Sequence, residues 1–199
     1  MRDTSDDVLW RRTVRGDRDA FAEIFDRHAR RIYGFCFRQT ADWAVAQDLT
    51  SITFLEAWRR RNSALIDEGK VLAWLFGVAY NTVRQQRRSL RRYREALERL
   101  PVPTATPDHA EDSAARAAAE REAAELLQKI RRLPSAQRAA LSLVMWEGLT
   151  PAEVAVALDK PEATVRSSLH RARRTLRTDT DTELAPRSPI SFHEGTGSR

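Results

Sequence analysis

The stretch Thr150–Arg177, TPAEVAVALDKPEATVRSSLHRARRTLR, decides the fold of the C-terminal half of the chain. Its start predicts a helix, because a Thr cap at Thr150, Pro151 in the first turn and Glu153 three residues after the cap together make a capping box. A tight turn follows at Asp159, a residue type that tolerates the left-handed backbone conformation. A second helix fills the rest of the stretch, so the segment is predicted to be a helix-turn-helix.

The second helix of this pair has an apolar side and a basic side. Val165, Leu169, Ala172 and Leu176 recur at helical spacing and are expected to face the core. A helix fits the major groove of duplex DNA, where side chains near its N-terminus reach base edges and arginines grip phosphates. A solvated basic face on an ordinary helical hairpin is the alternative interpretation. The residues predicted to contact duplex DNA are Thr164, Arg166, Ser167, His170, Arg171 and Arg174.

A second motif, Ala73–Asn81 (AWLFGVAYN), is apolar and aromatic and runs directly into an arginine-rich segment. Aromatic faces stack on unpaired bases and neighbouring arginines hold the backbone, a combination that suits single-stranded DNA. Trp74 is expected to lie in the core rather than to stack on a base. For Tyr80 and Asn81 both alternatives stay open: burial in the core, or contact with a base. The residues predicted to contact single-stranded DNA are Tyr80, Asn81, Arg84, Arg87 and Arg88.

The chain as a whole has the composition of an all-α protein with two small helical domains. Gly is scarce, good helix formers dominate, and no run alternates polar and apolar residues in the manner of a strand. Prolines interrupt the helical pattern within residues 101–113, which are therefore predicted to be a flexible linker. The linker would separate an N-terminal domain at 1–100 from a C-terminal domain at 114–177, and a disordered tail is expected at 178–199.

Several classes of protein are disfavoured by composition. A single cysteine, Cys36, allows no internal disulfide and no cysteine-rich zinc site, which favours a cytoplasmic setting. No apolar run approaches the roughly 18 residues of a membrane span, so no membrane insertion is expected. The four histidines are scattered and no carboxylate cluster, phosphate loop or metal motif is present. We therefore expect no enzyme, no metal and no cofactor, and the net charge of +6 mildly favours a polyanionic partner.

Three motifs together resemble the extracytoplasmic-function (ECF) sigma factors of bacterial RNA polymerase. A helix with an exposed polar side is expected at Ala46–Trp58, and its Asp48-Leu49 pair with the run after Phe54 is similar to the family's polymerase-docking helix. Ala73–Asn81 with the following arginines is similar to the promoter-melting helix, and Leu133–Arg173 is similar to the C-terminal helix-turn-helix domain.

The resemblance implies a sigma factor that binds core RNA polymerase and promoter DNA and directs promoter-specific initiation. The N-terminal domain would dock on the polymerase and read the −10 element, and the C-terminal domain would read the −35 element as duplex. An anti-sigma factor is a further partner that the resemblance raises. The chain departs from the family pattern at Ile52, where the family usually carries Glu, and at Tyr80, where it usually carries Arg. The residues implied in polymerase docking are Asp48, Leu49, Phe54 and Trp58.

A stand-alone helix-turn-helix regulator is the alternative function. Such a protein would bind duplex DNA without polymerase, usually as a dimer on a palindrome. The change from an apolar, aromatic segment to an arginine run after Asn81 speaks against this alternative, because duplex binding by the C-terminal half does not require it.

Overall fold

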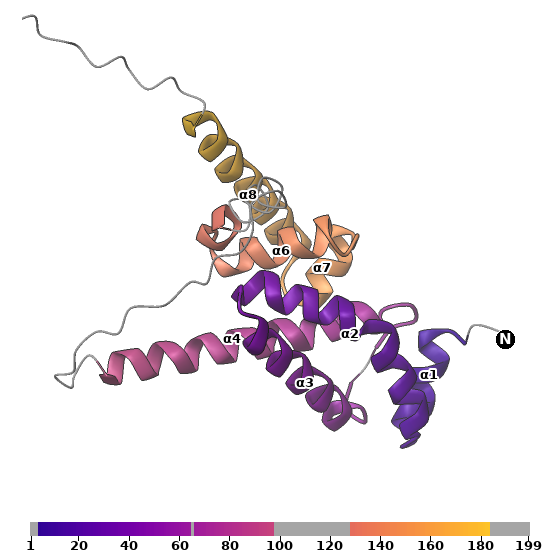
Figure 1. The fold of residues 1–199 in the computed structure, drawn as a ribbon. Coiled ribbons are helices and arrows are strands. Elements are labelled where there is room, and N and C mark those ends of the chain that lie inside the picture. The colour runs from indigo at the N-terminus through magenta and orange to yellow at the C-terminus, as the bar shows by residue number, and fades with distance from the viewer. Residues whose placement is uncertain (1–3, 65, 98–127, 184–199) are drawn as a thin grey trace, which may run out of the picture.

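The computed structural model describes residues 4–64, 66–97 and 128–183, and within these ranges it contains helices and no strand (Figure 1). The expected all-α class is confirmed. The predicted linker at 101–113, most of the helix expected at 114–132 and the last part of the predicted tail lie outside the described residues. The helices are α1 (Asp6–Val14), α2 (Arg18–Thr40), α3 (Trp43–Arg60), α4 (Val71–Leu97), α6 (Ser135–Met145), α7 (Pro151–Leu158) and α8 (Glu162–Glu183).

Short polar side chains fix where the N-terminal helices begin. Asp17 caps α2, because its carboxylate accepts hydrogen bonds from the backbone N–H groups of Asp19 and Ala20, both at 3.0 Å. These bonds and the nearby Arg12 guanidinium hold the pKa of Asp17 below its ordinary value. Asp42 caps α3 in the same way through the N–H of Val45 at 2.9 Å. Asp is a preferred residue at both positions, because its short side chain reaches the free N–H groups of the first turn.

The N-terminal half is a bundle in which α2 packs on α1, α3 and α4. One stripe of α2, with Ile24, Ile32 and Phe35 at helical spacing, is buried, whereas Phe25 is partly exposed at the rim and packs edge-on against Phe54. His28 lies on the same stripe and is buried, and its Nε2 lies 2.6 Å from a carboxylate oxygen of Asp6.

The C-terminal half consists of α6, α7 and α8, with residues 128–132 also helical. Val165, Leu169 and Ala172 are buried and Leu176 is half-buried, so the apolar side predicted for α8 is confirmed. The expected end of this helix at Arg177 was too early, because α8 continues to Glu183. Residues 178–183, which the sequence places in the tail, therefore belong to α8.

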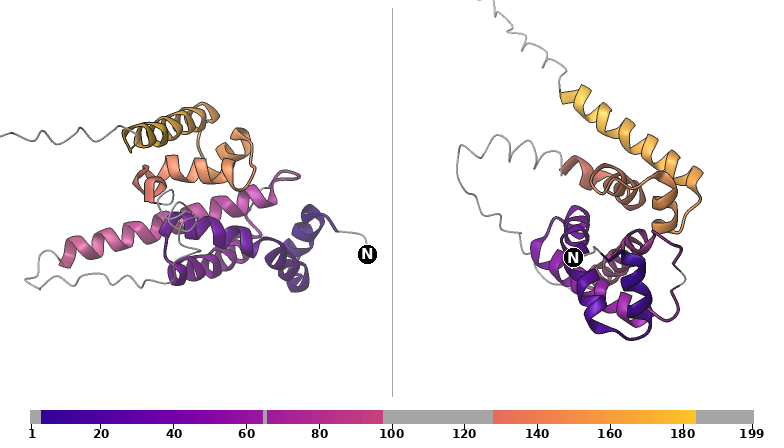
Figure 2. Two further views of the ribbon diagram at one scale, coloured as in Figure 1. Left: turned by 45° about the horizontal axis from the view of Figure 1, so that its top comes forward. Right: turned by 90° about the vertical axis from the view of Figure 1, so that its right-hand side faces the viewer.

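The two halves pack against each other. Figure 2 shows α6 and α7 lying over α2 and α4, with α8 on the outer side of α6. Buried side chains of both halves belong to one hydrophobic cluster. The α4 helix connects the two halves, because it contacts α2 and α3 in the N-terminal half and α7 in the C-terminal half.

Candidate nucleic-acid and polymerase interfaces

Local hydrogen bonds fix the start of α7, and a residue with left-handed backbone ends it. The Thr150 hydroxyl accepts the N–H of Glu153 at 3.3 Å, and the Glu153 carboxylate accepts the N–H of Thr150 at 2.8 Å. These bonds lower the pKa of the Glu153 carboxyl, the backbone bond from Thr150 being the main cause. Asp159 ends α7 with φ of 50°, in the left-handed region. The capping box and the turn predicted from the sequence are both confirmed.

The basic side of α8 is open to solvent. Arg166 extends from the first turns and pairs with Glu162, whose carboxylate lies 2.6 Å from its Nη2. Arg171 donates to the Ser167 backbone carbonyl and hydroxyl, both at 3.3 Å. A rigid helix that displays several arginines and small polar groups on one exposed side can enter a groove of duplex DNA. All six residues predicted to contact duplex DNA, Thr164, Arg166, Ser167, His170, Arg171 and Arg174, are exposed on this helix.

A second basic stripe follows the exposed side of α4. Asn81, Arg84 and Arg88 recur at intervals of three and four residues and line a hollow of about 490 Å³. Asn81 and Arg88 are exposed and Arg84 is half-buried. An Asn amide beside guanidinium groups can hydrogen-bond a base edge while the arginines neutralise phosphates. The other residues that line this hollow are Gln85, Arg91 and Arg92.

Two of the residues predicted to contact single-stranded DNA are not on this open stripe. Tyr80 is only 5% exposed and has the guanidinium of Arg84 at 5.6 Å from its ring centre. Arg87 is half-buried and donates a hydrogen bond to the backbone carbonyl of Gln39 on α2. Burial lowers the pKa of Arg87. The structure therefore brings Asn81, Arg84 and Arg88 together and places Tyr80 and Arg87 inside.

The four residues implied in polymerase docking divide between surface and core on α3. Asp48 is exposed, whereas Leu49 and Phe54 are buried. Trp58 is half-buried, with its ring 5.2 Å from that of Phe21 and the Arg61 guanidinium 4.1 Å from its centre. Asp48 is thus the member of the set that a partner can reach directly, and the other three support the helix from within.

Two apolar residues on the outer face of α3 extend this surface. Ile52 is 43% exposed and Leu55 is 49% exposed, and the two lie one and two turns after Asp48. A groove of about 280 Å³ runs between α3 and α4 beside Ile52 and includes Asn81 of the basic stripe. The sequence pattern had not separated these exposed residues from the core residues between them, since both are apolar.

A cluster of charged groups joins the two halves and was not predicted. Glu147, at the end of α6, has a side chain only 5% exposed and pairs with Arg31 and Arg38 of α2. Arg38 also donates to the hydroxyl of Ser142 at 2.7 Å. No sequence signal could have located this cluster, because its members are more than 100 residues apart and it depends on how the halves pack.

Residues 4–64, 66–97 and 128–183 contain no group of three or more His, Cys, Asp or Glu side chains placed to hold a metal ion. None of the helices in the described part of the chain is long and apolar enough to cross a bilayer.

Both halves match families of transcription proteins. Residues 24–93 match the family described as Sigma-70 region 2, and residues 123–176 match Sigma-70 region 4. These ranges cover the α3 and α4 surfaces and the helix-turn-helix, so each candidate interface lies within a matched region. The fold and its exposed basic helices thus place the chain in the class of sigma-70-type factors.

Comparison with curated relatives identifies the family within this class. The chain is 32% identical over 176 residues to the ECF RNA polymerase sigma factor SigK of Mycobacterium ulcerans, an alignment that covers 87% of this chain and 93% of SigK. It is also 32% identical over 174 residues to the ECF RNA polymerase sigma factor BldN of Streptomyces coelicolor, covering 84% of this chain and 63% of BldN. The chain belongs to the ECF family of RNA polymerase sigma factors. It is a sigma factor that binds core RNA polymerase and directs promoter-specific transcription initiation.

Solved structures of other sigma factors share the fold. CnrH, in its complex with the cytosolic domain of CnrY, superposes with a TM-score of 0.64 at 22% identity, over 90% of this chain and 99% of that one. RpoE of Bartonella quintana, in its complex with the anti-sigma factor NepR, gives 0.63 at 19% identity, over 82% and 98%. Both show the same arrangement of helical regions at low sequence identity.

Proposed function

We propose that three separate helices divide the work of promoter recognition in this chain. The outer face of α3 around Asp48 docks on core polymerase, the α4 stripe with Asn81, Arg84 and Arg88 binds the single strand of the −10 element, and α8 reads the −35 element as duplex. The observation that carries this proposal is that the two halves each present an exposed basic helix side, and these sides differ in chemistry. The α8 side combines arginines with small hydroxyl side chains, whereas the α4 side combines arginines with the amide side chains of Asn81 and Gln85.

The energetics of promoter opening favour action within a holoenzyme rather than alone. Separating about ten base pairs costs on the order of 14 kcal/mol at about 1.4 kcal/mol per step. Stacking a base on an aromatic side chain returns about 1–3 kcal/mol. One or two captured bases cannot offset that cost, so we expect the isolated chain to leave duplex promoters closed.

The partners proposed for the chain follow from its family. Core polymerase and promoter DNA engage the exposed faces of α3, α4 and α8. An anti-sigma factor is a further partner, proposed because RpoE of Bartonella quintana was solved bound to one. We propose a cytoplasmic specificity subunit with no catalytic step of its own, since the polymerase supplies the chemistry.

The docking surface is tested by mixing the purified chain with bacterial core polymerase and following co-elution on size-exclusion chromatography. We expect the wild-type chain to co-elute and Asp48→Arg to lose co-elution, because the reversed charge lies at the centre of the proposed surface. Asp26→Arg is the matched control, since Asp26 is an exposed acidic residue on α2 away from that surface. Equal co-elution of Asp48→Arg and wild type would exclude this docking face.

The same experiment separates the sigma mechanism from the alternative regulator. A regulator that acts without polymerase would bind duplex DNA tightly by itself and would not co-elute with core. We expect weak, salt-sensitive duplex binding by the free chain instead, because a few arginine–phosphate contacts lose affinity steeply as salt rises.

A further inference from the structure

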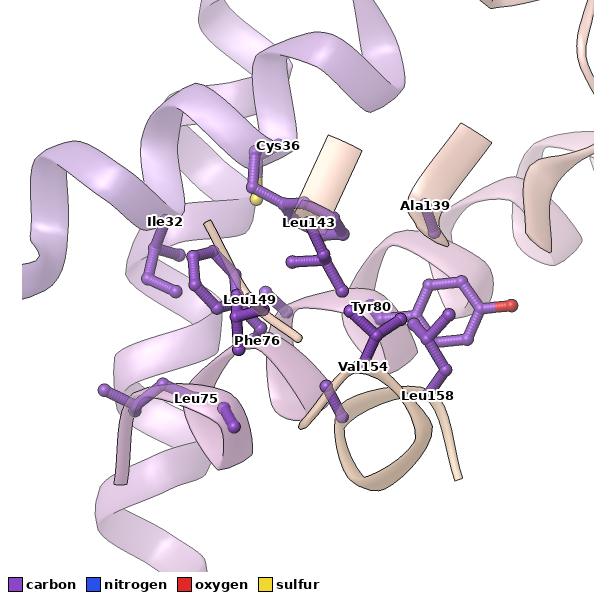
Figure 3. Packing of buried hydrophobic residues seen from close by; sticks show 14 of the residues in the cluster. Ile32, Cys36, Leu75, Phe76, Tyr80, Ala139, Leu143, Leu149, Val154 and Leu158 are labelled. Carbon is purple, nitrogen blue, oxygen red and sulfur yellow. The ribbon is translucent and has the colours of Figure 1, made fainter. Parts of the chain in front are cut away.

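Helix α7 lies directly on the part of α4 that carries Tyr80. Figure 3 shows the Tyr80 ring beside Leu158 and Val154 of α7, with Ala139 of α6 nearby. These four side chains are buried members of the one hydrophobic cluster that spans both halves. The C-terminal half therefore covers Tyr80 in this arrangement.

The backbones of the two halves approach closely at one point. A Cβ atom built on Gly77 of α4 would lie 2.8 Å from the carbonyl oxygen of Ala157 on α7, closer than real Cβ atoms come to other atoms. Any larger residue at Gly77 would have to push α7 away, because the neighbouring atom is backbone and cannot rotate aside. The absence of a side chain at Gly77 thus permits the covered arrangement.

An ion cluster fastens the same interface on the α2 side. Glu147 accepts from Arg31 Nε at 2.9 Å, and its backbone carbonyl accepts from Arg31 Nη2 at 2.8 Å. Its other carboxylate oxygen accepts from Arg38, whose guanidinium also lies 5.4 Å from the ring centre of Trp146. The Glu147 side chain is almost fully buried and has both partners, so removing it would leave two arginines without this carboxylate.

Elsewhere in the interface, arginines of the two halves repel each other and oppose the attraction between Glu147 and its arginines. Arg138 of α6 is 8% exposed, its Nη1 donates to the carbonyl of Arg131 at 2.9 Å, and its Nε is buried with no hydrogen-bond partner in the described ranges. Burial, together with the nearby charges of Arg87 and Arg131, lowers the pKa of Arg138 to about 10. The packing of the two halves thus places the buried Arg138 near the half-buried Arg87, and this repulsion between like charges favours separation of the halves.

We propose that the C-terminal half is an intramolecular cover of the −10 reader, so that Tyr80 contacts single-stranded DNA only after α6 and α7 leave α2 and α4. This inference rests on the proposed function of α4. In the closed chain the outer face of α3 and the basic side of α8 remain exposed while Tyr80 is buried. The chain can therefore meet polymerase and duplex DNA in its closed form, and opening completes the −10 site.

The proposal is tested with two opening variants that act by different physics. Glu147→Ala removes the ion cluster, and Gly77→Leu forces the backbones apart. Each has a matched control: Glu23→Ala removes an ion pair within α2, and Ala152→Leu adds the same bulk on the exposed side of α7. Circular dichroism checks that each variant keeps its helices, and small-angle scattering reports the separation of the halves.

The readout is binding of a fluorescently labelled oligothymidylate strand, followed by polarisation. We expect both opening variants to expand and to bind at least roughly fivefold tighter than wild type, the gain expected from stacking one base. The controls should bind as wild type does. Adding Tyr80→Ala to either opening variant should abolish the gain, which shows that the gain passes through Tyr80.

Two results would overturn the proposal: opening variants that bind the strand no tighter than wild type, or a gain that persists without Tyr80. Failure of the proposed function would look different. If the outer face of α3 does not bind core polymerase, Asp48→Arg and wild type co-elute with core polymerase equally. The opening variants would still bind the single strand more tightly than wild type, because that gain depends only on the exposure of Tyr80.

Discussion

Arg31 and Glu147 are 116 residues apart in the sequence, yet the Nε atom of one lies 2.9 Å from a carboxylate oxygen of the other. The contact joins a helix of sigma region 2 to the end of a helix of sigma region 4. Because the Glu147 side chain is nearly buried, this pair is less screened by water and salt than a surface pair. It is therefore the kind of contact that can hold two small domains together.

The capping box of α7 predicts a measurable acid sensitivity. The folded-state pKa of Glu153 lies below its ordinary value of 4.5, so its stabilisation is complete above that value and is lost as pH falls through the folded-state pKa. Glu153→Gln keeps the acceptor oxygen but removes the titration. We expect wild type to be the more stable of the two at neutral pH and the difference to vanish in acid, as measured by urea unfolding across pH.

The threonine of the same box should matter independently of pH. Thr150→Ala removes the oxygen that accepts the Glu153 N–H, which costs about 1 kcal/mol for a helix cap. Thermal unfolding should show the loss, and Thr150→Ser should restore most of the stability because the hydroxyl remains. Equal stability of the Ala and Ser variants would mean that the cap contributes nothing in this fold.

Cys36 should be chemically silent in the folded protein. Its thiol is buried, and burial raises its pKa to about 12, so the reactive thiolate is almost absent at neutral pH. We expect Ellman's reagent to react slowly in buffer and rapidly in urea. Rapid reaction under native conditions would contradict the burial of the thiol.

Exposed apolar residues on α3 should contribute to polymerase binding. Leu55→Ala and Ile52→Ala each remove apolar surface next to Asp48, and truncation at the centre of an interface typically costs about 1–2 kcal/mol. Biosensor measurements with immobilised core polymerase would detect a loss of roughly five- to thirtyfold. Trp43→Ala is the control, since Trp43 is 65% exposed at the start of α3 and should have no effect if docking is confined to the Asp48 face.

The recognition helix makes a prediction about sequence preference. Arg166→Ala removes a side chain able to form a bidentate bond to a base, so holoenzyme should lose about 1–3 kcal/mol at its preferred −35 sequence and discriminate less among altered sequences. Arg132→Ala removes an exposed arginine outside α8 and serves as the control. A uniform loss across all sequences would instead identify Arg166 as a phosphate contact.

Local features of this fold were predictable because the atoms that decide them are neighbours in the chain. The cap at Asp17, the box at Thr150 and the left-handed turn at Asp159 each depend on groups within a few residues. The buried side of α8 followed from the spacing of Val165, Leu169 and Ala172 for the same reason. Such patterns are sufficient for helices and for the helix-turn-helix.

The packing of the two halves could not be predicted in this way. The burial of Tyr80 depends on α7, more than 70 residues later in the chain, and on the missing side chain at Gly77. Likewise, the apolar spacing in α3 places Ile52 on the same face as Leu49, yet Leu49 is buried and Ile52 is 43% exposed. Only the relative position of the neighbouring helices decides which residues of an apolar stripe are covered.

The most direct test of the central claim is transcription in vitro from fragmented genomic DNA of the source organism, with core polymerase in the presence and absence of this chain. We predict transcripts that appear only with the chain and whose start sites share one pair of upstream sequences, and we predict that Asp48→Arg abolishes them. Identical transcripts with and without the chain would contradict a sigma function and would leave duplex binding by α8 as its remaining activity.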